Sequence, residues 1–374
     1  MMKRPCTLFL AALICALSPS CRRPDVREDF VTAPNAQQGR NYPMVNSEGR
    51  VRVRIDAPYA HSVKLDIDGR KYRLRRERNG NWFGESDPLY DGFHYYRLIV
   101  DGAVVPDPSC QYYYGDSRWG SGVDIPSPDQ DFFEVKNVPH GQVRGTWYWS
   151  EKKQQTRHIF VYTPAEYDRN PDKRYPVLYL LPGGAETEYS WVRQGHLAEI
   201  LDNLYAEGLA RPFIVVMDNC VLQNPYEWEE DYNGILTDDL IPMVDSTFRT
   251  IPDGAHRAMA GLSYGGLQTK WSVFAHPELF SAVGSFSGGA YTVAEAESHP
   301  GFAENIKLVF VSFGDAEIEN PTFGIDPGTD PRQDTEALRE YGMNAHLYLA
   351  PHVHHTWHAW RRSLREFAQL LFRD

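Results

Sequence analysis

The sequence has few cysteines, and none of them forms a close pair. It holds 5 cysteines among 374 residues, and Cys110 and Cys220, the two beyond the amino-terminal region, lie far apart with no Cys-x-x-Cys spacing. That spacing supports neither a disulfide framework nor a thiolate zinc site. We therefore expect two separate buried thiols.

Basic residues are in deficit, and long apolar runs are missing from most of the chain. Lysine and arginine total 38 against 50 for aspartate and glutamate, which gives a formal net charge of -12. Such a field repels phosphate backbones, so we do not expect nucleic acid as a partner. No stretch beyond the amino terminus reaches transmembrane length without charges, so we expect no transmembrane segment.

The amino terminus has the pattern of an export signal. Lys3 and Arg4 precede an apolar run at residues 8–17, which is too short to span a bilayer but fits the core of a signal peptide. Residues 1–21 are therefore predicted to be a signal peptide. Cys21 follows small residues where a bacterial signal could be cleaved and the cysteine lipidated, so simple secretion and a lipid anchor both stay open. We expect a secreted, periplasmic or outer-membrane lipoprotein of a bacterium.

Length and composition predict two folded domains. A chain of 374 residues is about two domains long. Its 42% hydrophobic and 13% aromatic residues suffice for their cores, which excludes a largely disordered chain. Residues 22–40 are polar, contain prolines and a glycine, and show no apolar period. We expect a flexible linker there.

Residues 41–140 show the period of half-buried strands. Val51, Val53 and Ile55 alternate with charged residues, and residues 63–68 repeat the pattern. Asp-Gly and Asn-Gly dipeptides, which favour hairpin turns, separate further strand candidates at 71–74, 81–84, 93–100 and 132–135. The pattern predicts a β-sandwich of about 100 residues.

After a second linker, expected at 141–155, the pattern changes to alternating strands and helices. Strands are predicted at 176–181, 213–217, 257–260, 282–286, 307–313 and 345–349. Helices are predicted at 196–207, 236–248, 264–275, 334–341 and 357–372. This alternation predicts an α/β fold, with a mostly parallel, doubly wound sheet covered on both faces, over residues 156–374.

One short segment carries a nucleophile candidate. Gly261-Leu262-Ser263-Tyr264-Gly265-Gly266 lies directly between a predicted strand and a predicted helix. It matches the Gly-x-Ser-x-Gly turn, whose glycines permit a sharp bend that presents a serine hydroxyl at the edge of the sheet. An ordinary glycine-rich turn is the alternative. The strand and helix around the motif favour Ser263 as a nucleophile.

A base and a carboxylate, which a serine nucleophile needs, follow in the expected order. Asp315 and Glu317 come at the end of one predicted strand, and several histidines come after another. Carboxyl ends of strands are where open α/β sheets bind ligands. A zinc or copper site is the competing interpretation of the crowded histidines His352, His354, His355 and His358. No motif supplies the matching carboxylate spacing, so we expect no metal.

Ester chemistry also needs N–H donors for the oxyanion. One is commonly the backbone N–H after the nucleophile, here that of Tyr264, and another comes from the loop after an earlier strand. Leu181-Pro182-Gly183-Gly184 follows such a strand. Its glycines let the backbone approach substrate closely, so Gly183 or Gly184 is expected to donate. A plain β-turn is the alternative.

Longer segments extend the pattern beyond the serine turn. They include PVLYLLPGG, HRAMAGLSYGGLQT, HPELFSAVGSFSGG and HHTWHAWRRSLREFAQLLF. Over residues 156–374 the chain resembles carbohydrate esterase family one, the feruloyl and acetylxylan esterases, and the related esterase-D-like hydrolases. The segments VRVRIDAPYAHSVKLDIDG and DGFHYYRLIVDG resemble an immunoglobulin-like module, akin to glycogen-binding modules. The resemblance implies an α/β-hydrolase domain preceded by an immunoglobulin-like sandwich, which is carbohydrate-binding-module-like.

The resemblance also implies residue roles. It gives Ser263 as nucleophile, His355 as general base and Glu317 as the acid, with Asp315 as runner-up, because the family usually has aspartate where Glu317 stands. Pro182 is a second departure, since the family has histidine there. Proline has no N–H, so the oxyanion donors must come from its neighbours.

Substrate contacts are predicted at the end of another strand and in the loop that follows it. Asp218 and Asn219 lie where ligands bind in such sheets, and Tyr226 and Trp228 are suited to stacking on a sugar or phenolic ring. Packing of the loop on itself is the alternative for these aromatic residues.

Together with these features, the resemblance implies a serine esterase that removes feruloyl or acetyl groups from plant cell-wall xylan or xylo-oligosaccharides through an acyl-enzyme. No metal or organic cofactor is expected. A siderophore esterase or an acyltransferase of the same fold would share the triad and differ only in its pocket and acceptor. A carbohydrate-binding surface protein with a weak or inactive catalytic domain is the alternative from another class.

Overall fold

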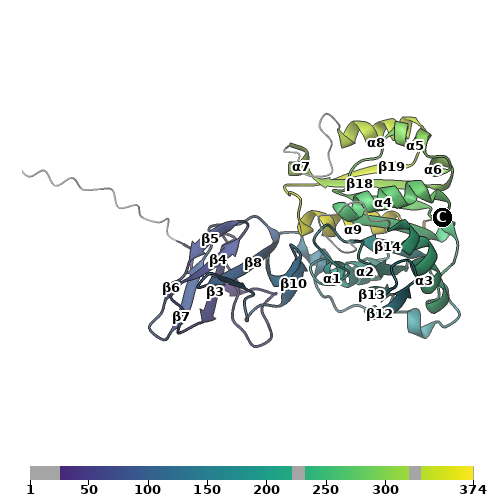
Figure 1. Ribbon diagram of the computed structural model, residues 1–374. Helices are drawn as coiled ribbons and strands as arrows, with labels where there is room; N and C mark the ends of the chain where they lie inside the picture. Colours follow the sequence, from purple (N-terminus) through teal and green to yellow (C-terminus); the bar gives the residue numbers. More distant parts are fainter. Residues whose placement is uncertain (1–25, 221–231, 320–329, 374) are drawn as a thin grey trace, which may run out of the picture.

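The computed structural model describes residues 26–220, 232–319 and 330–373. The predicted signal peptide with Cys21, and the loop residues Tyr226 and Trp228, lie outside these ranges. Two parts lie side by side (Figure 1): an amino-terminal sandwich and a larger α/β domain. None of the described helices is long and apolar enough to cross a membrane.

The sandwich consists of two antiparallel sheets, in the orders β1-β2-β3-β7-β6 and β10-β11-β8-β4-β5, with β9 paired to β8. The predicted alternation explains its core, because Val51, Val53 and Ile55 are buried while the residues between them are not. Its strands are β1 (Val31–Thr32), β2 (Met44–Val45), β3 (Val51–Asp56), β4 (Val63–Ile67), β5 (Arg70–Arg73), β6 (Arg75–Arg76), β7 (Asn81–Glu85), β8 (Gly92–Val100), β9 (Ala103–Val105), β10 (Tyr112–Gly115) and β11 (Arg118–Ile125).

The α/β domain has one eight-stranded sheet, in the order β12-β13-β15-β14-β16-β17-β18-β19. The pairs β12–β13 and β13–β15 are antiparallel, and the other neighbours are parallel. Its strands are β12 (Gln142–Ser150), β13 (Gln155–Thr163), β14 (Val177–Leu181), β15 (Ile214–Met217), β16 (Arg257–Leu262), β17 (Ala282–Phe286), β18 (Leu308–Gly314) and β19 (Ala345–Ala350).

Helices cover both faces of this sheet, because successive residues of its buried strands point to opposite sides. Leu178 and Leu180 pack in the same cluster as α2 and α9, whereas Tyr179 and Leu181 pack with α3, α4 and α8. The helices are α1 (Tyr189–Val192), α2 (Leu197–Ala206), α3 (Ile241–Thr247), α4 (Tyr264–Ala275), α5 (Val293–Ser298), α6 (Phe302–Asn305), α7 (Asp315–Glu319), α8 (Pro331–Glu340) and α9 (Trp357–Leu370). Segments of 3₁₀ or π helix are η1 (Gln130–Phe133), η2 (Tyr167–Arg169), η3 (Ile235–Leu240), η4 (Gly254–His256) and η5 (Pro277–Leu279).

Both predicted linkers need correction where the structure describes them. Within 22–40, β1 pairs with β2, and Ala36 forms a bridge to Cys110. Residues 141–155 contain β12, the edge strand of the large sheet. Backbone hydrogen bonds to β13 hold β12 in the sheet, while its tryptophans remain largely exposed. The segment therefore lacks the pattern of buried apolar residues that would predict a strand. The strand expected at 132–135 is likewise wrong, because η1 occupies this region.

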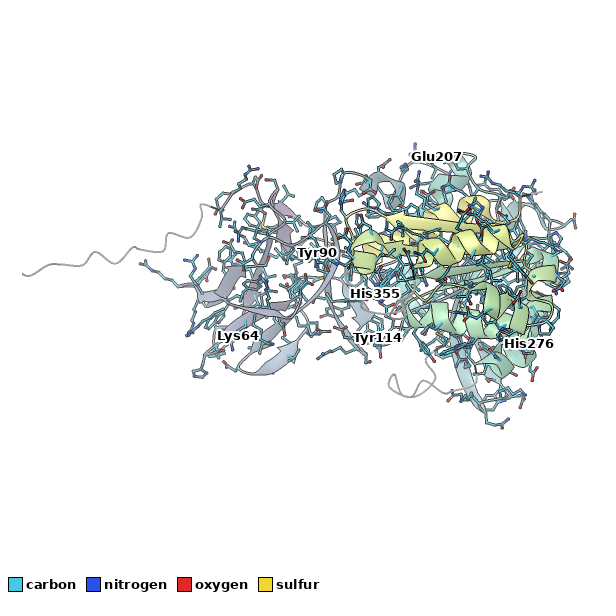
Figure 2. All side chains as sticks on the ribbon, turned by 90° about the horizontal axis from the view of Figure 1, so that it is seen from above. Lys64, Tyr90, Tyr114, Glu207, His276 and His355 are labelled. Carbon is cyan, nitrogen blue, oxygen red and sulfur yellow. The ribbon has the colours of Figure 1, made fainter. Side chains whose placement is uncertain are left out.

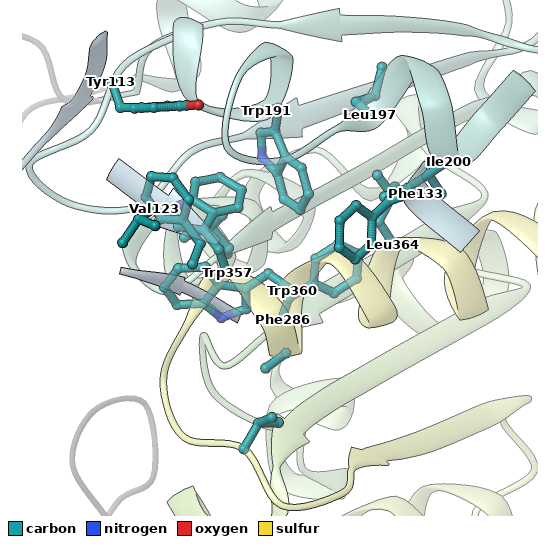
Figure 3. Close-up of a cluster of buried hydrophobic side chains, with 14 of the residues drawn as sticks. Tyr113, Val123, Phe133, Trp191, Leu197, Ile200, Phe286, Trp357, Trp360 and Leu364 are labelled. Carbon is teal, nitrogen blue, oxygen red and sulfur yellow. The ribbon is translucent and has the colours of Figure 1, made fainter. Parts of the chain in front are cut away.

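The two parts share one continuous hydrophobic cluster. Phe93 and Val123 of the sandwich belong to the same cluster as Trp191, Trp357 and Trp360 of the α/β domain, and Figure 3 shows several of these side chains together. The sandwich therefore packs directly against the α/β domain through a shared hydrophobic core.

A buried ion pair crosses the same junction. Arg361 Nη1 on α9 lies 2.7 Å from Asp124 Oδ1 on β11, with side chains 0% and 11% exposed. Burial opposes ionisation of Asp124, but the Arg361 guanidinium outweighs it and the pKa of the carboxyl falls below its ordinary value.

Both expected thiols, Cys110 and Cys220, are buried and free.

Candidate active site

Ser263 sits on a strained turn between β16 and α4. Its backbone has φ 51° and ψ -119°, which is unusual for a residue with a side chain. Gly261 and Gly265 make the bend possible, because a Cβ on either would collide with neighbouring backbone. The sequence thus folds here into the sharp strand-to-helix turn that the Gly-x-Ser-x-Gly spacing predicts.

The structure brings Ser263, His355 and Glu317 into one chain of hydrogen bonds. The Nε2 atom of His355 lies 3.0 Å from Ser263 Oγ, and its Nδ1 lies 2.7 Å from Glu317 Oε2. With the proton on Nδ1, the imidazole donates to Glu317 and accepts from the serine hydroxyl. This is the arrangement in which a histidine can take the serine proton.

Glu317, and not Asp315, faces the histidine. Its side chain is 1% exposed, and its Oε1 accepts hydrogen bonds from Ser287 Oγ and from the Gly314 N–H, both at 2.8 Å. Asp315 instead lies at the start of α7, where backbone N–H groups of residues including His352 hold its pKa below the ordinary value against the effect of burial. Of the two carboxyl groups, Glu317 is therefore the one that contacts His355.

The two segments expected to supply the oxyanion donors both lie close to the serine. Tyr264 begins α4 directly after Ser263, so its N–H lies at the helix terminus where partial positive charge collects. Gly183 lies against the nucleophile, because a Cβ there would be 3.6 Å from Ser263 Cβ and 2.6 Å from a Leu262 methyl carbon. The Gly183 N–H donates to Glu186 Oε2 at 3.2 Å, and Gly184 lines the same cavity as Ser263.

A cavity of about 350 Å³ contains the serine and the histidine, and both parts of the molecule line it. Figure 2 shows Tyr90 of the sandwich and His355 of the α/β domain at this junction. The lining residues are Asp66, Asp68, Gly69, Tyr90, Phe93, His94, Tyr95, Arg97 and Asp116 from the sandwich, and Gly183, Gly184, Glu186, Leu262, Ser263, His355, Thr356, Trp357 and Trp360 from the α/β domain.

The substrate contacts predicted at Asp218 and Asn219 need correction. Asp218 is 1% exposed and pairs with Arg157 Nη2 at 2.8 Å, and it also accepts a hydrogen bond from the Tyr232 hydroxyl at 2.9 Å. The Asn219 carbonyl accepts from the same arginine. Neither residue lines the cavity, so this strand end is held together internally. Tyr226 and Trp228 lie outside the described residues.

The crowded histidines separate in space into different surroundings. His355 joins Ser263, while His358 is buried in α9, where desolvation, with a contribution from Arg362, lowers its pKa to about 4. Among residues 26–220, 232–319 and 330–373, no group of three or more His, Cys, Asp or Glu side chains could hold a metal ion.

Sequence reasoning missed the sandwich side of the cavity and the buried Glu186. Glu186 follows the Gly183-Gly184 turn by two residues, and that proximity was the only available signal. Asp66 and Arg97 are cross-strand partners on β4 and β8, but nothing in the sequence indicated that this face of the sheet meets the α/β domain.

Comparison with known proteins finds similarity to esterases. Residues 150–369 match the Esterase family model, described as "Putative esterase". The chain is 41% identical over 362 residues, 93% of its length, to an endo-1,4-beta-xylanase/feruloyl esterase of Xylanibacter ruminicola. It is 30% identical over 190 residues, 44% of its length, to endo-1,4-beta-xylanase Y of Acetivibrio thermocellus. It spans 48% of the first relative and 17% of the second, about half their length or less.

Solved structures confirm the predicted fold class. A CE1 ferulic acid esterase of Anaeromyces mucronatus has a TM-score of 0.53 at 20% identity, covering 65% of this chain and 95% of that one. The enterobactin esterase of Shigella flexneri has a TM-score of 0.62 at 15% identity, covering 86% and 94%. At such identities the likeness shows a shared fold and leaves the choice of substrate to other evidence.

Proposed function

The chain belongs to the Esterase family, and from that premise we propose that it is a serine feruloyl esterase acting on plant cell-wall xylan. The hydrogen-bond chain from Ser263 through His355 to Glu317 carries the esterase part of this proposal. The feruloyl part is supported by the similarity to the Xylanibacter ruminicola xylanase/feruloyl esterase along 93% of this chain. Such a substrate lies outside the cell, in keeping with the export signal predicted at residues 1–21.

In the proposed mechanism, His355 Nε2 takes the Ser263 proton while Oγ attacks the ester carbonyl. The backbone N–H groups of Tyr264 and Gly184 hold the oxyanion of the tetrahedral intermediate. The intermediate collapses as His355 protonates the departing sugar oxygen, which leaves the acyl group on Ser263. Water, deprotonated by His355, then attacks the acyl-enzyme, and the carboxylic acid leaves as the serine recovers its proton. Glu317 holds the Nδ1 tautomer and stabilises the imidazolium.

The charge of the cavity favours a neutral substrate over an anionic siderophore. Its sandwich side presents the carboxylates of Asp66, Asp68 and Asp116 against one guanidinium, that of Arg97. A metal–catecholate siderophore is strongly anionic and would be repelled there. Sugar hydroxyl groups hydrogen-bond to carboxylates without that penalty.

The test is release of acid by residues 22–374 from methyl ferulate and from acetylated xylan side by side, with Ser263→Ala as control. We expect ferulate release that disappears in the variant. Acetate release alone would reassign the protein as an acetylxylan esterase. Release of neither acid from the folded protein would overturn the proposal.

A further inference from the structure

Glu186 is a buried carboxyl group beside the proposed nucleophile that the mechanism above does not use. It lines the cavity, is 8% exposed, and receives hydrogen bonds from three donors. Its Oε2 accepts from the Gly183 N–H at 3.2 Å, and its Oε1 accepts from the Tyr95 hydroxyl and from Trp357 Nε1, both at 3.0 Å. Burying a carboxyl group is costly unless hydrogen-bond donors compensate it. A buried glutamate at this position therefore suggests a role in the site.

Each of the three donors comes from a different part of the active region. Gly183 belongs to the loop that approaches the oxyanion, and Trp357 begins α9 two residues after His355. Tyr95 lies on β8 of the sandwich. Glu186 therefore joins the oxyanion loop, the histidine loop and the amino-terminal domain at one carboxyl group.

Tyr95 is itself held from the α/β domain. Its hydroxyl accepts a hydrogen bond from Gln194 Nε2 at 2.6 Å, and Gln194 also donates to the Tyr114 carbonyl at 2.7 Å. The Ser117 N–H, on the turn between β10 and β11, donates to the Ala185 carbonyl at 2.9 Å. The sandwich thus contacts the oxyanion loop directly as well as through Glu186.

We propose that Tyr95 and Glu186 are positioning residues for ester hydrolysis, with Tyr95 holding Glu186 and Glu186 holding the Gly183 backbone beside Ser263. The sandwich then completes the oxyanion side of the active site. With Glu186 occupying the Gly183 N–H, the oxyanion donor of this loop is Gly184. This inference rests on the proposed esterase function but not on the identity of the acyl group.

The protonation of Glu186 gives the proposal a distinctive signature. Burial raises its pKa to about 7, against the opposing effect of its three donors, and the Asp116 carboxylate raises it slightly further. The titratable groups that act on it are Tyr95 and Asp116 of the sandwich. The other charged or titratable groups that line the same cavity are Asp66, Asp68, Tyr90, His94, Arg97 and His355. Removing the Tyr95 hydroxyl removes a donor to the ionised form, so Glu186 should then lose its charge at a higher pH.

The experiment compares Tyr95→Phe and Glu186→Gln with Tyr113→Phe in residues 22–374. Tyr113 is a matched control, since its hydroxyl is buried in the same sheet but bonds Asn35 at 2.8 Å within the sandwich. The substrates are 4-nitrophenyl acetate, which any serine esterase should hydrolyse, and methyl ferulate. We expect kcat on 4-nitrophenyl acetate to fall about tenfold or more in both variants, with KM within about twofold, since removing an oxyanion donor outright costs about 100- to 1,000-fold. Tyr113→Phe should retain wild-type values.

A pH profile separates positioning from a general folding defect. We expect the acid limb of kcat to move to higher pH in Tyr95→Phe and to stay in place in Tyr113→Phe. An unchanged kcat in Tyr95→Phe, or a reduced kcat with an unmoved acid limb, would overturn the proposal. If the wild-type protein hydrolysed 4-nitrophenyl acetate but not methyl ferulate, only the feruloyl esterase assignment would be refuted. The comparison of the variants on 4-nitrophenyl acetate would still test the positioning proposal.

Discussion

The two sides of the cavity differ in how firmly their polar groups are held. On the α/β side, Glu317 is 1% exposed and accepts hydrogen bonds from a serine, a backbone N–H and His355. On the sandwich side, Asp68 and Asp116 have side chains 31% and 58% exposed. Proton transfer needs groups locked in position and shielded from water. We therefore expect the chemistry to take place on the α/β side, while the sandwich adds polar surface and, as proposed above, support from Tyr95.

The largest effect, a loss of kcat, is expected when the buried carboxylate of Glu317 on the α/β side is removed. Glu317→Gln removes the carboxylate that fixes the histidine tautomer, and we expect kcat to fall about 10⁴-fold, as for the aspartate-to-asparagine change in the serine protease triad. Asp315→Asn, two residues away, should change kcat less than about threefold, since Asp315 bonds backbone rather than His355. Steady-state kinetics on methyl ferulate give both values. Equal losses would contradict the assignment of Glu317.

The next largest effect concerns the ion pair that joins the two domains. Arg361→Ala leaves Asp124 buried without its partner, and we expect a loss of about 3–5 kcal/mol in the free energy of unfolding. Arg54→Ala is the control, because its pair with Glu77 is 34% and 39% exposed and worth at most about 1 kcal/mol. Urea titration measures both. A similar small loss in each variant would show that the junction contributes little to stability.

A smaller effect tests the close packing at the same junction. A Cβ at Gly92 would lie 2.7 Å from His358 Cβ, whereas one at Gly102 would meet nothing within 4 Å. Both glycines have positive φ, 107° and 92°, so Gly92→Ala and Gly102→Ala share the backbone strain. We expect Gly92→Ala to cost about 1–3 kcal/mol more, from overpacking alone. Equal destabilisation in the urea titration would mean that the domains are not closely packed there.

The smallest effect is a dependence of stability on pH that arises at the junction. Burial lowers the pKa values of His196 and His358 to about 4, and nearby arginines add to the shift. Unfolded histidine titrates near 6.5, so the unfolded chain binds more protons below that pH, and stability should fall from about pH 6.5 down to about 4.

A pair of variants attributes that pH dependence to the buried histidines. His358→Gln should flatten the fall in stability between about pH 6.5 and 4. His61→Gln should leave it unchanged, because the His61 side chain is 94% exposed. Melting temperatures across this pH range provide the comparison, and identical slopes in both variants would place the proton uptake elsewhere.

Sequence reasoning located the three side chains that the structure brings together, because their positions follow local rules. Ser263 lies between two glycines in a strand-to-helix turn, and the regions of Glu317 and His355 follow the ends of later strands. Parallel strands bring such ends to one edge of the sheet. The serine and the histidine region could therefore be identified without coordinates, while the glutamate needed the family resemblance to be preferred over Asp315.

Contacts between the domains could not be predicted in the same way. Tyr95 and Arg97 alternate with Tyr96 and Leu98 on β8, a pattern that fits a solvated outer face as well as a docked one. The strand β12 could not be predicted because backbone pairing with β13 holds it, and such pairing leaves no pattern of buried apolar residues in the sequence. Asp218 lies at the predicted edge of the sheet, but its carboxylate forms a buried ion pair with Arg157. Sequence spacing does not reveal such pairs.

Trapping the acyl-enzyme tests most directly whether Ser263 is the nucleophile. Residues 22–374 would be mixed with methyl ferulate, quenched in acid within the first turnovers, digested and examined by mass spectrometry. We expect the peptide containing Ser263 to gain the mass of one feruloyl group, and the Ser263→Ala peptide to gain none. A feruloyl group on another residue, or ferulate released at the wild-type rate by Ser263→Ala, would contradict it.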